Sequence, residues 1–287
     1  MIPSTERRRA LVWLLAGILL VSPAFAIELP DSFVRIDSDG SAPRALQVAL
    51  VQYVDASGRR LDLIGAVHVA EREYFATLER RFERYDALLY ELVADIGERK
   101  PPEKQSASAA MDWVGLIQGG LKNLLGLSFQ LEEIDYTAAN FMHADLSPGE
   151  LEAAMEARGE SWLGTWLQLW AAAQNSPGAQ VPTGGALLVM LLSNDRQGDM
   201  KRYMARALVE QLAATGTLGG ERGSALITER NRKALQVLEQ AIDAGAGSLG
   251  LFYGAAHMHD FHQQLVGKFG FLPVAIEWLD AWDLSAK

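Results

Sequence analysis

The chain contains no cysteine among its 287 residues. This absence excludes a thiolate nucleophile, a zinc site with cysteine ligands, a disulfide framework and a lipid anchor on cysteine. A chain of this length can bury a core large enough to be stable without disulfide bridges. An exported domain without disulfides is therefore feasible at this size.

Basic residues are also few. Lysine and arginine number 26 against 36 aspartates and glutamates, which gives a formal net charge of −10 at pH 7. Binding to nucleic acid draws on basic side chains that meet the phosphates. We therefore expect no nucleic-acid partner.

Long apolar runs are scarce, and the main one lies at the amino terminus. Arg7, Arg8 and Arg9 precede an apolar segment at 10–21, and Ala24-Phe25-Ala26 follows it. This order is typical of a cleaved signal peptide, and the segment is shorter than the roughly 20 residues of a membrane helix. We expect a signal peptide at 1–26, export to the periplasm or medium, and no membrane span after cleavage. An uncleaved amino-terminal anchor is the alternative.

The remaining pattern predicts strands at both ends of the mature chain. Apolar runs at 46–54 and 60–67 flank a turn and predict a hairpin, followed by a helix at 71–84 and a strand at 87–92. The last part repeats this order, with a strand at 249–253, a helix at 257–268 and a strand at 272–278. A strand, a helix and a strand in close succession form a βαβ unit.

Between these parts, residues at about 106–245 predict one helix after another. Ser147-Pro148-Gly149-Glu150 has the composition of a capping box at the start of a helix. Trp162, Trp166 and Trp170 follow at helical spacing, which favours a place in the core. We predict an α/β fold in which amino- and carboxy-terminal βα units build one mixed sheet. Residues 27–287 then form a single domain with a large helical insertion.

The most informative motif occurs twice. Gly65-Ala66-Val67-His68 and Gly254-Ala255-Ala256-His257 each close an apolar run and open a predicted helix. Histidine is the usual proton carrier and a common metal ligand near neutral pH. We therefore place a histidine at the tip of two matched strand-to-helix turns.

A carboxylate follows the first motif at a suitable distance. Glu91 ends the strand at 87–92, and ligands of open α/β sheets bind beyond the carboxyl ends of strands. His68, His257 and Glu91 should therefore converge. They could hold a divalent metal such as Zn, Mn or Co with water completing the shell. Alternatively, one histidine could be a metal-free general base. A helix amino terminus at His257 favours a neutral imidazole there.

The two ends can also be laid over each other. Tyr90-Glu91-Leu92 follows His68 after one helix, and Ile276-Glu277-Trp278 follows His257 after one helix. The parallel is compatible with an internal duplication or with two ordinary βαβ units.

Other polar residues are weaker candidates. Asp145 precedes the capping box and follows His143, and both are candidates for a place near the site. His259 and His262 share a helix face, which is most simply a surface. Arg230 and Asn231 lie in a charged helical run that is ordinarily a solvated face.

The order of these motifs resembles the TraB/PrgY/GumN family, which includes the Tiki proteins. Its members carry two GxxH motifs, a glutamate after the first, and an arginine between them. The resemblance covers about 47–278 and implies a site of His68, Glu91, Arg230 and His257, with Asn231 beside it. It also implies a fold related to the erythromycin esterase and ChaN-like group.

Function within that family points to peptides. Tiki proteins are described as metal-dependent proteases, whereas PrgY and TraB restrain peptide pheromones. We expect an exported, metallopeptidase-like hydrolase, with metal on His68, His257 and Glu91. Arg230 would bind a substrate carboxylate or a developing oxyanion, and Asn231 and Asp145 would contact substrate. A peptide-sequestering protein, a metal-free esterase-like hydrolase and a metal- or haem-handling protein are the alternatives. The sequence specifies no oligomeric state.

Overall fold

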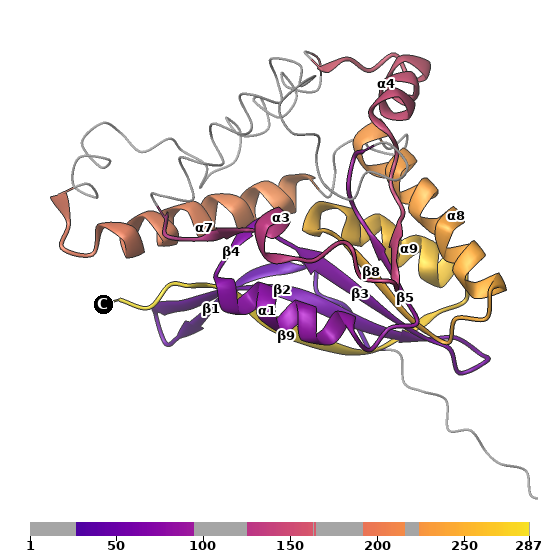
Figure 1. Cartoon of the computed structure of the whole chain (residues 1–287). Helices are drawn as coiled ribbons and strands as arrows, with labels where there is room; N and C mark the ends of the chain where they lie inside the picture. Colours follow the sequence, from indigo (N-terminus) through magenta and orange to yellow (C-terminus); the bar gives the residue numbers. More distant parts are fainter. Residues whose placement is uncertain (1–26, 95–124, 163, 165–191, 216–223, 287) are drawn as a thin grey trace, which may run out of the picture.

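A seven-stranded mixed sheet forms the centre of the computed structural model (Figure 1). The structure describes residues 27–94, 125–162, 164, 192–215 and 224–286. Its main path runs β1-β2-β3-β8-β5-β7, and β9 pairs with β2. The strands of this sheet are β1 (Val34–Asp39), β2 (Ala42–Val54), β3 (Arg60–Ala66), β5 (Ala87–Tyr90), β7 (Phe141–His143), β8 (Ser248–Gly254) and β9 (Leu272–Asp283).

The predicted hairpin is present as β2 and β3, which pair antiparallel. Asp55 holds the turn, because its Oδ1 accepts hydrogen bonds from the backbone N–H groups of Ser57 and Arg59, each at 2.9 Å. Gly58 adopts a φ of 82°, a left-handed conformation that glycine takes without strain. The turn chemistry fixes which residues of β3 face each side of the sheet.

Helices cover both faces of the sheet (Figure 1). On one face, α1 (Arg72–Phe82) packs Tyr74, Phe75, Leu78 and Phe82 into the core. On the other, α8 (Arg230–Asp243) and α9 (Met258–Gly267) cover β3, β5 and β8. Burial of each large apolar side chain contributes roughly 1.5–3 kcal/mol. These two clusters fix the strands on which the site is built.

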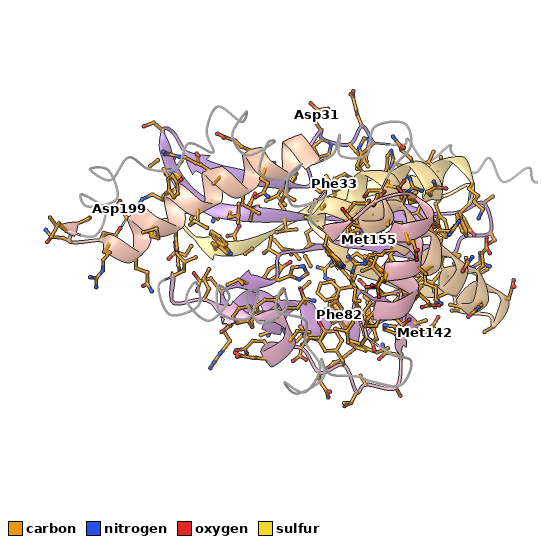
Figure 2. All side chains as sticks on the ribbon, turned by 90° about the horizontal axis from the view of Figure 1, so that it is seen from above. Asp31, Phe33, Phe82, Met142, Met155 and Asp199 are labelled. Atoms are coloured by element: carbon orange, nitrogen blue, oxygen red, sulfur yellow. The ribbon has the colours of Figure 1, made fainter. Side chains whose placement is uncertain are left out.

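The α/β prediction is confirmed, and the insertion supplies helices as expected. The described helices of the insertion are α3 (Gln130–Glu133), α4 (Pro148–Ala157), α7 (Arg196–Thr215), the single π-helical turn η2 (Ala225–Glu229) and α8. The capping box of α4 is present, with Ser147 Oγ accepting from the N–H of Glu150. In the view of Figure 2, α4 with Met155 and the start of α7 with Asp199 lie toward opposite ends.

The insertion is not purely helical. It also contains β6 (Ser128–Phe129), which pairs with β4 (Val69–Ala70), and β7, which extends the main sheet beside β5. Such short strands carry too few residues for a period-2 pattern to be visible. Trp162 is 56% exposed and so does not lie in the core. Trp166 and Trp170 lie outside the described residues.

The carboxy-terminal strand departs from a βαβ arrangement. β9 runs antiparallel beside β2, with Glu277 opposite Leu50, rather than parallel beside β8. Glu277 accepts two hydrogen bonds from Arg81, each at 2.7 Å. Its position is therefore not equivalent to that of Glu91. The second half therefore does not repeat the topology of the first, and the matching order of elements reflects two different units.

No helix within the described parts of the chain has the length and apolar character needed to cross a membrane.

Candidate active site

Four parallel strands bring the polar residues to one edge of the sheet. β8 lies between β3 and β5, and β7 follows β5, all in parallel. Ala66 pairs with Gly254, and Tyr90 pairs with both Phe252 and His143. The residues that follow these strand ends therefore emerge side by side: His68 after β3, His257 after β8, Glu91 after β5 and Asp145 after β7.

The expected convergence is visible at Gly254. A Cβ built on Gly254 would lie 3.1 Å from Glu91 Oε2, 3.6 Å from His68 Nε2 and 3.8 Å from His257 Cδ2. Three side chains from three strands thus face one point, which stays open because residue 254 has no side chain. Gly65 has another role, since a Cβ there would lie 2.9 Å from Val48 and 3.1 Å from the carbonyl of Ala49. The two motif glycines therefore serve different purposes: Gly65 lets strands pack, and Gly254 leaves space for a ligand.

Arg230 ties two carboxylates together beneath this point. It begins α8, directly after the π-helical turn η2. Its Nε and Nη2 donate to Asp145 at 2.9 and 2.6 Å, and Nη2 also donates to Glu91 Oε1 at 2.5 Å. Glu91 Oε2 accepts a further bond from the N–H of Gly254 at 2.5 Å. Glu91 is held at both oxygens and presents its charge in a fixed direction.

One N–H group of the Arg230 guanidinium has no hydrogen-bond partner among the described residues. Of its five N–H groups, three point at carboxylate oxygens, and Nη1 lies 3.4 Å from His257 Nε2. One Nη1 hydrogen therefore has no acceptor among the residues that the structure describes. Because the Nε–Nη2 edge is taken by Asp145, Arg230 can offer substrate a single N–H rather than a two-point fork. Of the two ligands expected from the sequence, this geometry suits an oxyanion better than a substrate carboxylate.

Asn231 sets the tautomer of His257. Its Nδ2 donates to the carbonyl of His257 at 3.2 Å and to Asp260 at 2.8 Å, which leaves Oδ1 as the acceptor. His257 Nδ1 lies 2.6 Å from this Oδ1 and so carries the proton. The unprotonated Nε2 then faces Arg230 and Glu91, which lies at 3.6 Å.

Gln130 does the same for His68. His68 Nδ1 lies 3.1 Å from Gln130 Oε1, while Gln130 Nε2 donates to Tyr136 at 2.8 Å. The backbone N–H of Gln130 also donates to the carbonyl of His68 at 2.9 Å. His68 therefore carries its proton on Nδ1 and directs the lone pair of Nε2 toward Glu91 and Gly254. Both imidazoles thus have their Nδ1 protons bound by a side-chain amide.

Burial and charge set the protonation of the group. The pKa of His257 is lowered to about 3, mainly by burial; the charge of Glu91 opposes this shift and that of Arg230 adds to it. Burial alone would raise the pKa of Glu91, but Arg230, the two histidines and the N–H of Gly254 together outweigh burial and hold this pKa well below its usual range. His257 is therefore neutral and Glu91 ionised at pH 7. The neutral His257 expected from its place at a helix start has burial as its main cause.

Two cavities meet at these side chains. The larger has a volume of about 510 Å³, and the smaller of about 220 Å³. Both are lined by His68, Glu91 and Arg230. His68 is exposed, whereas His257 lines only the larger cavity and is 3% exposed. A ligand can therefore reach the three shared side chains from two sides.

The remaining candidates lie beneath or away from the cavities. Asp145 and Asn231 are 1% and 0% exposed, and their polar atoms are engaged by Arg230, His257 and Asp260. They position the site instead of contacting substrate as the sequence suggested. Among the other histidines, His143 Nε2 lies 2.6 Å from the carbonyl of Leu92, His262 pairs with Tyr53, and His259 pairs with Gln263.

Gln130 is the one positioning residue that no sequence pattern indicates. It lies in the short helix α3 of the insertion, 62 residues from its partner His68. A glutamine without a motif around it carries no signal of its own. A buried polar side chain, here 4% exposed, becomes informative only with the fold known.

The fit of a divalent metal depends on Arg230. His257 Nε2 and Glu91 Oε1 lie 3.6 Å apart, but the guanidinium contacts both atoms. A divalent ion shared by them would meet this positive charge at close range. Across the described residues, no group of three His, Asp or Glu side chains forms a metal cluster. With the side chains in this arrangement the set does not fit a divalent ion, and metal binding stays a prediction that requires Arg230 to move.

Comparisons of the chain with protein-family models, with curated proteins and with solved structures find no match. The resemblance to the TraB/PrgY/GumN family therefore rests on the motifs alone.

Proposed function

We propose that this protein is a hydrolase that cleaves an acyl bond by general-base catalysis at His68. One observation carries the proposal: His68 Nε2 and Glu91 both lie beside the open point at Gly254, and Arg230, with one uncommitted N–H, lines the same cavity. A base, a charge that stabilises its protonated form and an oxyanion donor are the groups that acyl hydrolysis requires.

The reaction would proceed in two balanced stages. A water molecule bonds through its oxygen to the acyl carbon and gives a proton to His68 Nε2. The former carbonyl oxygen becomes an oxyanion that accepts the remaining N–H of Arg230. The bond to the leaving group then breaks, and the leaving oxygen or nitrogen takes the proton from His68. The products are an acid and an alcohol or amine.

Glu91 and His257 support the base in this scheme. The fixed carboxylate of Glu91 stabilises the imidazolium that forms at His68. His257, neutral and buried, accepts an Nη1 hydrogen of Arg230 through Nε2 and so helps to orient the guanidinium. We assign the base to His68 and not to His257 because His68 is exposed and can exchange its proton with solvent, whereas the low pKa of His257 makes it a weak base.

Export is a separate part of the proposal, whereas peptide substrates and a metal cofactor stay predictions that the turnover and metal-binding experiments test. Peptides and metal follow from the resemblance, and export follows from the signal-like residues 1–26, which lie outside the described residues. Mass spectrometry of native material tests export, with an amino terminus within a residue or two of Ile27 as the expected result.

Turnover assays test the hydrolase. The mature chain is incubated with p-nitrophenyl esters and a fluorogenic peptide library, each with and without chelator. His68→Gln should lower kcat/KM by roughly 10²–10⁴-fold, the range of a general base, with an unchanged melting temperature. His259→Gln is the matched control, since His259 contacts Gln263 on the exposed surface of α9. Equal losses in both variants, or no turnover of any substrate, would reject the hydrolase.

A further inference from the structure

The larger cavity is lined mostly by apolar residues. Four titratable side chains line it, His68, Glu91, Arg230 and His257, and all belong to the site described above. Apart from Gln211, the other described residues that line it are apolar or glycine. They include Met204, Leu208 and Leu212 of α7, Leu226 and Ile227 of η2, and Trp282 of β9. The cavity is thus a hydrocarbon-lined chamber that leads to a hydrolytic centre.

The smaller cavity lies beyond the same centre. Besides the three shared side chains it is lined by Leu92, Val93, Phe129, Gln130 and Leu131. A substrate whose carbonyl lies at Gly254 would therefore extend into a chamber of about 510 Å³ on one side and of about 220 Å³ on the other. The unequal volumes favour a substrate with one long and one short arm.

From these walls we propose that the substrate is an ester of an aliphatic carboxylic acid with a small alcohol. This inference rests on the proposed hydrolase function. The aliphatic acyl chain occupies the larger chamber and the alcohol occupies the smaller one. Ammonium and carboxylate groups of a peptide would find no counter-charge among the described walls, because every charged side chain there is already paired at the site. A hydrocarbon chain needs none.

The chemistry is the balanced hydrolysis given above. Water oxygen bonds to the acyl carbon, His68 receives the water proton, and the acyl C–O bond breaks. The alcohol leaves with the proton from His68, and the acid is released as a carboxylate. No oxidant, reductant or second substrate enters the step.

An ester series tests the length of the chain. On p-nitrophenyl esters from acetate to decanoate, kcat/KM should rise about three- to fourfold per methylene until the chamber is full, since each buried CH₂ contributes about 0.8 kcal/mol. Leu208→Trp fills the chamber from α7 and should remove the rise of kcat/KM with chain length. Leu208→Ala enlarges it and should move the optimum to longer chains. Arg206→Trp, on the exposed side of the same helix, should change neither.

A binding measurement separates this inference from the hydrolase proposal. Titration with 1-decanol should change the tryptophan fluorescence, and Trp282→Phe should remove most of that change, because Trp282 lines the chamber. Saturable decanol binding that Leu208→Trp abolishes supports the chamber even if no ester is turned over. Hydrolysis of acetate without any dependence on chain length overturns the inference but leaves the hydrolase standing. Faster turnover of a peptide with charged ends than of any aliphatic ester also overturns it.

Discussion

Arg230 and Asp145 lie 85 residues apart in the chain and form a two-point ion pair, with distances of 2.9 Å from Nε to Oδ1 and 2.6 Å from Nη2 to Oδ2. Asp145 follows β7 of the insertion, whereas Arg230 opens the helix that leads back to the carboxy-terminal strands. The pair therefore joins the two ends of the insertion beneath the site. Because Arg230 also holds Glu91, the insertion determines the orientation of the central carboxylate.

Removal of this guanidinium should destabilise the fold. Arg230→Met leaves Glu91 and Asp145 buried without their counter-charge, which should cost about 3–5 kcal/mol of unfolding free energy. Urea unfolding followed by circular dichroism measures this. Arg232→Met is the matched control, because the side chain of Arg232 is 69% exposed and its partner Glu229 keeps an ion pair with Arg158; its effect should stay within about 1 kcal/mol. Similar losses in the two variants would contradict the role given to Arg230.

Gly254→Ala should remove activity and leave the fold intact. Gly254 has a φ of −51°, so alanine meets no backbone strain there. Its methyl group would occupy the point shared by Glu91, His68 and His257. We expect kcat/KM to fall by at least about tenfold, because water and the acyl carbon lose their place.

Gly149→Ala is the control for this change, since a Cβ at Gly149 meets nothing within 4 Å. It should leave both turnover and melting temperature unchanged. Full activity in Gly254→Ala would show that the reacting atoms lie elsewhere.

Acid should destabilise the protein through His257. The unfolded imidazole takes up a proton below a pH of about 6.5, whereas the folded imidazole does so only near its pKa of about 3. Between these values the unfolded state binds more protons, so the free energy of unfolding falls as the pH falls. The limiting slope for this one group is about 1.4 kcal/mol per pH unit.

Urea unfolding between pH 5.5 and 6.5 measures this slope above the range in which Glu91, with an unfolded pKa of 4.5, contributes. His257→Asn keeps a donor for Asn231 and removes the titrating ring. The pH slope of the wild type should exceed that of the variant, and His262, whose pKa is also lowered by burial, adds equally to both. Identical slopes would show that His257 takes up its proton in the folded protein as readily as in the unfolded one.

Gln130 should act through His68. Gln130→Leu removes the acceptor of the Nδ1 proton, so the ring can change tautomer or rotate away from Glu91. We expect kcat to fall by roughly tenfold or more, but by less than the 10²–10⁴-fold loss of the base itself, with KM little changed. The pH dependence of kcat should also shift, which a purely structural role would not produce. Gln263→Leu, which removes the partner of His259, should change neither.

Much of the site could be predicted from the sequence, because neighbouring parallel strands end at the same edge of the sheet. Once 60–67, 87–92 and 249–253 are recognised as strands, their carboxyl ends share an edge, and His68, Glu91 and His257 follow. Arg230 came from the resemblance, since its charged surroundings favour a solvated face.

Other features depend on contacts that no local pattern encodes. β9 lies antiparallel beside β2 because its apolar residues pack against that strand, which a strand period alone does not specify. Gln130 and the aliphatic walls from α7 reach the site only through the tertiary fold.

The last prediction concerns metal. In the wild type, Arg230 contacts both Glu91 Oε1 and His257 Nε2, so a divalent ion at those atoms would have to displace a paired guanidinium. We expect isothermal titration with Zn, Mn and Co to show weaker binding to the wild type than to Arg230→Met, by at least about tenfold, since the variant frees the carboxylate and removes a positive charge. His68→Ala and His257→Ala in the Arg230→Met background should abolish the gain, because two imidazoles and one carboxylate would then be reduced to two ligands. Tight, stoichiometric binding to the wild type that His68→Ala and His257→Ala each abolish would instead establish the metal site expected from the sequence, and it would mean that Arg230 leaves Glu91 when the ion enters.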